Sequence, residues 1–155
     1  MRRQLVAGVA AGAALLLASV AAAKGPESAS VSGPGLERSM AVAGQGEMGP
    51  GTPLGMLVDA GGFFAQMYGQ TPDPTLKLRP AGTLGAHYRV TYVVPGPNGI
   101  RSRVVQDVYP FAKPVPLTYM RPGQRYWGNR LAHGGWFRSS PALRQALVHA
   151  GLHVS

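Results

Sequence analysis

Cysteine is absent from the 155 residues of the chain. This absence excludes disulfide bonds, thiolate metal sites, cysteine nucleophiles and the cysteine-linked lipid anchor of exported lipoproteins. Acidic residues are also scarce, since six Asp and Glu stand against fifteen Lys and Arg. These few carboxylates are scattered along the chain and do not indicate the paired acids of a glycosidase.

Sequence motifs for catalysis or cofactor binding are missing as well. No serine lies in a G-x-S-x-G elbow. His149 and His153 have the spacing of two metal ligands on one helical face, but Gly151 separates them and no third ligand is evident. Residues 44–49 read GQGEMG, a literal GxGxxG, but Pro50 disfavours the helix start that a dinucleotide-binding loop requires. We therefore expect no cofactor and no metal, and the sequence favours a non-enzymatic protein over an enzyme.

The first 23 residues contain the three parts of an export signal. A short basic start is followed by a small, apolar stretch over residues 5–20, and three alanines at 21–23 match the cleavage pattern. Residues 5–23 are also just long enough to cross a membrane. The segment is therefore interpreted as a signal peptide or an N-terminal membrane anchor, and we favour cleavage.

The remaining 132 residues are enough for one small domain. With 22 Gly and 14 Pro in the chain, we expect many turns beside the regular elements. We predict that residues 24–155 form a single exported domain, with residues 24–30 as a flexible lead. Its expected location is outside the cell or in the cell envelope.

Period-two alternation of apolar and polar residues predicts several strands. Residues 86–94 and 100–109 alternate in this way on either side of a PGPNG turn, which is typical of a β-hairpin. Residues 28–32 and 40–43 are predicted to form a second hairpin, and residues 115–120 a further strand.

Two segments predict helices. Thr52 followed by proline is a favoured start for a helix over residues 53–68, which Gly61-Gly62 can divide into two pieces. Ser140 is the predicted cap of a helix over residues 141–150. The sequence thus predicts an α+β fold, in which two short helices pack on one face of a small antiparallel β-sheet. The expected core residues are Tyr88, Val90, Tyr92, Val104, Val108, Leu143 and Leu147.

Positive charge is concentrated in the C-terminal half. Residues 24–76 carry a net charge of −3, whereas residues 77–155 carry eleven Lys and Arg against Asp107 alone, a net charge of +10. Nine of the eleven are arginine, whose planar fork suits carboxylate and phosphate groups. This charge distribution predicts an anion-binding surface in residues 77–155. The alternative is that the arginines reflect the composition of the chain and only keep the surface of the sheet solvated. The candidate anion-binding residues are Arg101, Arg103, Arg125, Arg130 and Arg138.

Aromatic residues are interleaved with these arginines. Tyr126, Trp127 and Trp136 are the predicted contacts, able to stack on sugar rings or to lie at a membrane interface. We predict an exported, envelope-associated, non-enzymatic protein whose basic half binds an anionic lipid, a cell-wall polymer or another envelope protein. Nucleic acid is not expected as its partner. Two alternatives stay open: a small exported hydrolase with an unidentified site, and a structural protein with a protein partner.

Short segments spread over most of the chain resemble a group of exported bacterial proteins rich in Gly and Pro. The segments are SGPGL at 32–36, GQTPDP at 69–74, YRVTY at 88–92, YPFA at 109–112 and GGWF at 134–137. That uncharacterised group has no assigned activity. The resemblance implies a single exported domain and carries over no functional residues.

Overall fold

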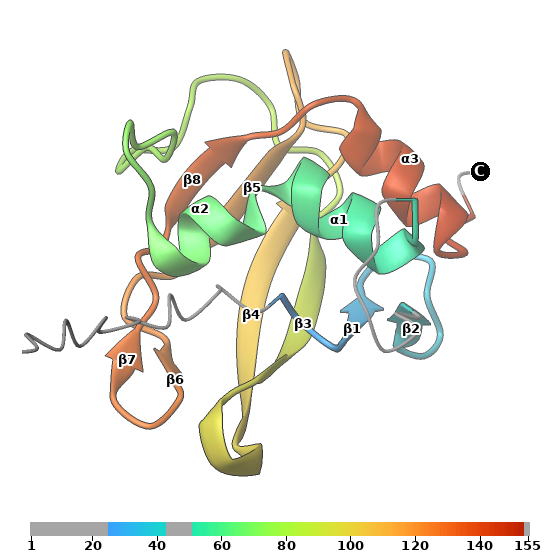
Figure 1. Cartoon of the computed structure of the whole chain (residues 1–155). Coiled ribbons are helices and arrows are strands. Elements are labelled where there is room, and N and C mark those ends of the chain that lie inside the picture. The colour runs from blue at the N-terminus through green and yellow to red at the C-terminus, as the bar shows by residue number, and fades with distance from the viewer. Residues whose placement is uncertain (1–24, 43–50, 154–155) are drawn as a thin grey trace, which may run out of the picture.

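The computed structural model describes residues 25–42 and 51–153 (Figure 1). The predicted export segment, residues 1–23, and the GxGxxG stretch at 44–49 lie outside the described residues. None of the described helices has the length and apolar character needed to cross a bilayer.

One antiparallel sheet of six strands, in the order β2-β1-β3-β4-β5-β8, forms the centre of the fold. A separate two-stranded hairpin consists of β6 and β7. The strands are β1 (Ser28–Ser32), β2 (Met40–Val42), β3 (Tyr88–Pro95), β4 (Arg101–Tyr109), β5 (Leu117–Met120), β6 (Arg125–Tyr126), β7 (Arg130–Leu131) and β8 (Gly135–Arg138).

Both predicted hairpins are confirmed. β3 pairs with β4 along its whole length, and the connecting turn has positive φ at Asn98 and Gly99, where these residues are favoured. β1 pairs with β2 and, through its other edge, with β3. β5 confirms the further predicted strand, with shorter bounds. β8 was not predicted, because a four-residue segment that begins with the second of two glycines gives no alternation signal; its pairing with β5 makes it a strand.

The helices are α1 (Pro53–Gly61), α2 (Phe63–Tyr68) and α3 (Ala142–His149). The predicted cap of α1 is confirmed, because the Thr52 hydroxyl oxygen accepts a hydrogen bond from the Gly55 N–H at 3.0 Å. Gly62, with φ of 68°, ends α1 and precedes α2. The predicted cap of α3 is corrected: Pro141 is already helical, and Ser140 contributes its backbone carbonyl to Leu143 rather than its hydroxyl.

The helices lie against one face of the sheet, with α3 beside α1 (Figure 1). The fold is therefore α+β, as predicted. The interior between helices and sheet is apolar, and the seven predicted core residues are each at most 6% exposed. These are Tyr88, Val90, Tyr92, Val104, Val108, Leu143 and Leu147.

A buried polar network joins the α1–α2 junction to the sheet. Gln106 on β4 donates from Nε2 to the Gly61 carbonyl (2.9 Å) and to Gln66 Oε1 (2.6 Å), and accepts from the Tyr92 hydroxyl (2.9 Å). Thr118 on β5 donates to the same Gly61 carbonyl (2.8 Å). Since these polar groups are fully buried and hydrogen-bonded to one another, they fix how the helices sit on the sheet.

Candidate functional site

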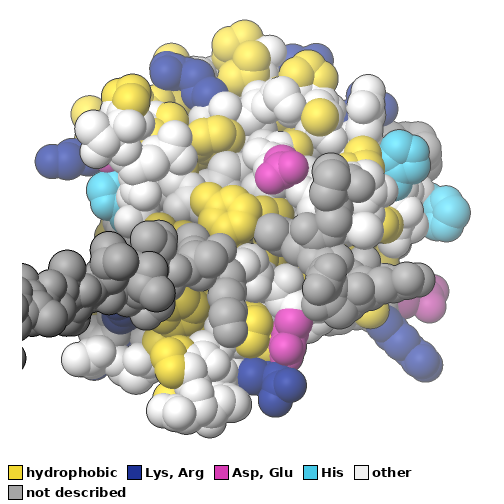
Figure 2. All heavy atoms as spheres, in the orientation of Figure 1, with side chains coloured by type: hydrophobic (Ala, Val, Ile, Leu, Met, Phe, Trp, Pro, Cys, Tyr) yellow, Lys and Arg dark blue, Asp and Glu magenta, His cyan; other side chains and the backbone are white. Residues whose placement is uncertain are grey.

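The predicted arginines on the central sheet lie on the face that the helices leave free, called here the open face. Side chains alternate along a strand, and Val104, Gln106 and Val108 of β4 point into the core. Arg101 and Arg103 therefore point the other way, and Arg138 of β8 shares their face through its register with Leu117. On the helix-bearing side, Lys and Arg lie around the margins and do not gather into a patch (Figure 2).

The open-face arginines differ in their ion pairs. Arg101 pairs with Glu27 at 2.5 Å, and Arg89 of β3 lies 3.7 Å from Asp107. Arg103 and Arg138 are exposed and have no acidic partner within the described part of the chain. Among the arginines of β3, β4 and β8, these two therefore carry a charge that no ion pair compensates in the described residues.

Arg103 borders a shallow hollow of about 400 Å³ on the open face. Three hydroxyl-bearing side chains, Ser28, Ser30 and Thr91, line it, and the sheet register places Ser30 of β1 directly opposite Thr91 of β3. Hydroxyl donors beside an uncompensated guanidinium are groups that hydrogen-bond an oxyanion. This arrangement is called here the hydroxyl hollow.

The other predicted contacts lie on the β6–β7 hairpin. Arg125 and Arg130 are exposed, and the Arg130 guanidinium stands 5.7 Å from the centre of the Trp127 ring. The prediction for Tyr126 is corrected, because its ring is only 5% exposed and packs in the core against Tyr68. Trp127 is half-buried and its indole nitrogen is enclosed. The structure thus separates this hairpin set from the open-face arginines.

Trp136 belongs to an aromatic row on the open face. Its ring centre lies 4.8 Å from that of Tyr119 and 5.9 Å from that of Tyr109, which stacks on His87 at 5.1 Å. Between the strands carrying Tyr109 and Trp136 lies Leu117, which is 3% exposed although it is outside the main core. The four residues His87, Tyr109, Trp136 and Tyr119 are called here the aromatic row.

The row's two tyrosines were not predicted as contacts. Tyr109 shares the alternate, mainly polar side of its strand with Asp107, so its place on the open face follows from the register of the hairpin. Burial, with a smaller contribution from Asp107, raises the pKa of the Tyr109 hydroxyl, which is therefore protonated near neutral pH. Tyr119 reaches the row because β5 pairs with β8, a contact that local sequence does not reveal.

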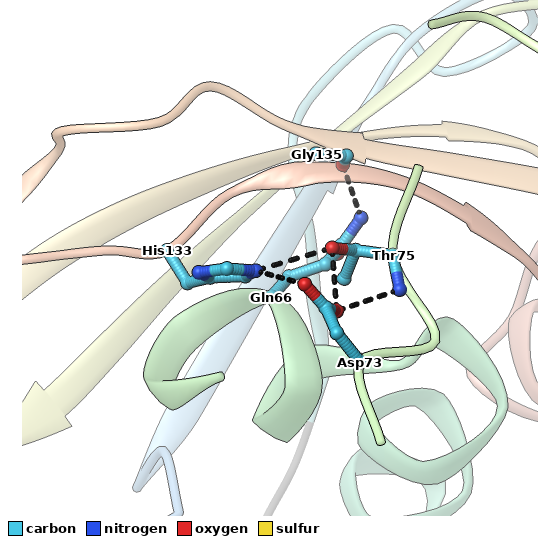
Figure 3. Close-up of polar contacts among 5 residues, drawn as sticks. All are labelled: Gln66, Asp73, Thr75, His133 and Gly135. Atoms are coloured by element: carbon cyan, nitrogen blue, oxygen red, sulfur yellow. Dashed lines mark hydrogen bonds and ion pairs between the residues drawn. The ribbon is translucent and has the colours of Figure 1, made fainter. Parts of the chain in front are cut away.

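Beyond Tyr119 the surface opens into a groove of about 390 Å³. Its polar residues are Asp73, Thr75, Lys77 and His133, and Tyr119 forms part of its wall. His133 Nε2 lies 2.7 Å from Asp73 Oδ2, and the Thr75 hydroxyl donates to Asp73 Oδ1 at 2.7 Å (Figure 3). None of these polar groups was predicted as a site residue.

Backbone pairing brings these distant residues together. Leu76 and Trp136 exchange two backbone hydrogen bonds of 2.8 Å, which attach the loop after α2 to the outer edge of β8. The buried Gln66 side chain donates to the Gly135 carbonyl at 2.8 Å, as Figure 3 shows, and the backbone carbonyl of Gln66 accepts from the Gly134 N–H. Hydrogen bonds to α2 and to β8 therefore fix the segments that line the groove.

The Asp73–Thr75–His133 cluster has the geometry of a polar clamp rather than of a nucleophile and its base. In a Ser–His–Asp site the acid and the nucleophile bind opposite nitrogens of the imidazole. Here Asp73 and Thr75 both approach Nε2, and the Thr75 hydroxyl gives its proton to Asp73. Hydrogen bonds from the Thr75 hydroxyl and N–H lower the pKa of Asp73, so the carboxylate is ionised near neutral pH.

Nowhere in residues 25–42 and 51–153 do three or more His, Asp or Glu side chains gather so as to hold a metal ion. The chain matches no family model, and no curated protein or solved structure is significantly similar to it.

Proposed function

We propose that this protein is an exported, envelope-associated binding protein that attaches to an anionic polymer or surface through the open face of its sheet. The observation that carries the proposal is the presence of two exposed arginines without acidic partners, Arg103 and Arg138, on the same helix-free face. Both arginines lie on strands whose backbone is already ordered by pairing. The protein therefore loses less conformational entropy when a ligand binds to them.

The hydroxyl hollow supports this proposal. A carboxylate or phosphate at Arg103 receives two parallel hydrogen bonds from the guanidinium, and Ser30 and Thr91 offer further donors in the same hollow. The net charge of +9 for the whole chain adds a long-range attraction for a polyanion. The clamp geometry at Asp73 favours binding over hydrolysis as the role of this surface.

Co-sedimentation across a salt series tests the proposal. Protein recovered from cells expressing the whole chain is mixed with purified bacterial envelope material and, separately, with anionic vesicles. We expect binding to fall steeply between about 0.01 M and about 1 M salt, because the Debye length falls from about 30 Å to about 3 Å. Absence of binding at low salt would contradict the proposal.

Arginine variants identify the surface responsible. The double variant Arg103→Gln, Arg138→Gln is expected to bind about tenfold more weakly at low salt, which corresponds to ~1.4 kcal/mol for two charge-assisted contacts. Arg144→Gln, on α3, is the control, because it removes a positive charge from the opposite side of the sheet. If the open-face variant and Arg144→Gln weaken binding equally for each charge removed, net charge alone explains the binding. That result would contradict a specific role for the open face.

A further inference from the structure

We infer that the anionic partner is an acidic polysaccharide, one ring of which stacks on the aromatic row while its hydroxyls reach the Asp73–His133 groove. The inference rests on the proposed function and names the class of ligand. Three observations carry it: the partly exposed rings of the row, the polar groups of the adjoining groove, and the arginine two residues from Trp136 in the row.

The aromatic row offers partly exposed rings. Tyr109, Tyr119 and Trp136 are each half-buried, and no helix covers them. The face of an aromatic ring carries partial negative charge and attracts the polarised C–H groups on the flat side of a sugar ring. Because the rings pack against one another, at centre distances of 4.8 Å, 5.1 Å and 5.9 Å, they are held in place before any ligand arrives.

The groove offers the hydrogen bonds that sugar hydroxyls require. Asp73 Oδ2 accepts from His133 and retains one lone pair for a ligand hydroxyl, while Lys77 supplies donors on the same wall. Tyr119 belongs to the aromatic row and also forms part of the groove wall. A sugar ring that stacks on Tyr119 therefore has one edge toward the polar side chains of the groove. A volume of about 390 Å³ falls within the usual range for a small-ligand site, roughly 300–1,000 Å³.

A positively charged side chain lies next to the aromatic row. Arg138 follows Trp136 by two residues on β8 and points to the same face, at a strand distance of about 7 Å. A polymer that carries carboxylates on successive sugar rings matches this alternation of ring surface and guanidinium. A lipid headgroup supplies the charge without the rings, so the acidic polysaccharide is the ligand class that uses both features.

Three probes separate ring recognition from charge recognition. A galacturonate oligomer has rings and charge, its fully methyl-esterified form has the same rings without charge, and poly-aspartate has charge without sugar rings. Binding to the protein recovered from whole-chain expression is followed through Trp136 fluorescence in a Trp127→Phe background, which leaves one tryptophan. Within the described residues the Trp127 indole nitrogen has no hydrogen-bond partner, so the change to Phe removes no hydrogen bond and keeps an aromatic ring beside Arg130.

Tyr119→Leu removes the ring shared by row and groove, and Tyr119→Phe keeps it as the matched control. We expect Tyr119→Leu to weaken both galacturonate probes about tenfold while poly-aspartate binding is unchanged, and Tyr119→Phe to stay within about twofold of the parent. Arg103→Gln, Arg138→Gln is expected to weaken the charged oligomer and poly-aspartate but not the ester.

The outcomes separate the two proposals. If galacturonate and poly-aspartate bind equally well and Tyr119→Leu affects neither, the inference is overturned while the proposed function stands. If neither charged probe binds at low salt but the ester does, the proposed anion-binding function fails, and the inference of an acidic polysaccharide fails with it. Binding of anionic vesicles alone, without any binding of the sugar probes, overturns the inference in favour of a lipid surface.

Discussion

Asp73 is exposed, yet its carboxylate already has several partners within the chain. Its Oδ1 accepts from both the N–H (2.8 Å) and the hydroxyl (2.7 Å) of Thr75, and its Oδ2 faces His133. Thr75 is two residues away, whereas His133 comes from the start of the segment that leads into β8. One half of the clamp is therefore a local turn and the other half is a tertiary contact.

Replacing Thr75 is expected to shift the pKa of Asp73. The Thr75 hydroxyl is the largest cause of the lowered pKa, so Thr75→Ala should raise it toward the ordinary value of 3.8. Because the folded-state pKa is depressed, the stability contributed by these contacts is complete above the unfolded pKa and is lost as pH falls through the folded one. Carboxyl ¹³C NMR titration measures the shift.

Thr75→Ser is the control for this titration, because it keeps the hydroxyl. The serine variant should keep the Asp73 pKa of the parent, while the alanine variant, which retains only the Thr75 N–H and His133 as partners, should have a higher Asp73 pKa than the parent. Identical titration curves for the parent and Thr75→Ala would show that the hydroxyl does not stabilise the carboxylate.

At the scale of elements, the two predicted helix starts had different outcomes. Thr52 lies in extended backbone before Pro53, so its side chain reaches the N–H of Gly55. At α3 the same residue order, a hydroxyl residue followed by proline, gives no side-chain cap, because Pro141 has already entered the helical turn. The position of the proline decides between the two, because Pro53 follows the N-cap residue of α1 whereas Pro141 is itself the N-cap residue of α3.

Thr52→Ala is expected to destabilise the fold by about 1 kcal/mol, the usual effect of losing an N-cap. Ser140→Ala, which removes a hydroxyl that makes no cap, should change the free energy of unfolding by less than about 0.5 kcal/mol. Urea unfolding followed by circular dichroism compares the two variants with the parent. Equal losses of stability in both would contradict the difference between the caps.

At the scale of the whole molecule, the sheet separates packing from the proposed binding role. Its helix-bearing face holds the apolar core, and its open face presents the arginines, the hydroxyl hollow and the aromatic row. The hairpin β3–β4 contributes to both faces through period-two alternation. Anion binding on one face therefore requires no change in the packing of the other.

The predicted export segment leads to a measurement on the whole chain. We expect protein recovered from outside the cytoplasm of an expressing bacterium to begin at Lys24, which intact mass spectrometry detects as the loss of residues 1–23. Ala23→Leu, which replaces the small residue before the cleavage point, should preserve the full-length mass. Full-length protein confined to the cytoplasm would contradict export.

The sequence by itself determined the local features of this protein. Alternation over 86–109 predicted the central hairpin, its core side and the placement of Arg101 and Arg103, because period two is a property of each strand alone. Thr52 and Gly62 likewise act on neighbouring backbone. These signals need no knowledge of distant residues.

Only the tertiary structure decided the aromatic row and the groove. Trp136 meets Tyr109 and Tyr119 because three strands pair, and Asp73 meets His133 across 60 residues of sequence. Tyr126, predicted as a surface contact, is buried because α2 packs over it through Tyr68. Such contacts depend on which strands become neighbours, and that choice follows from burying one common core rather than from any single segment.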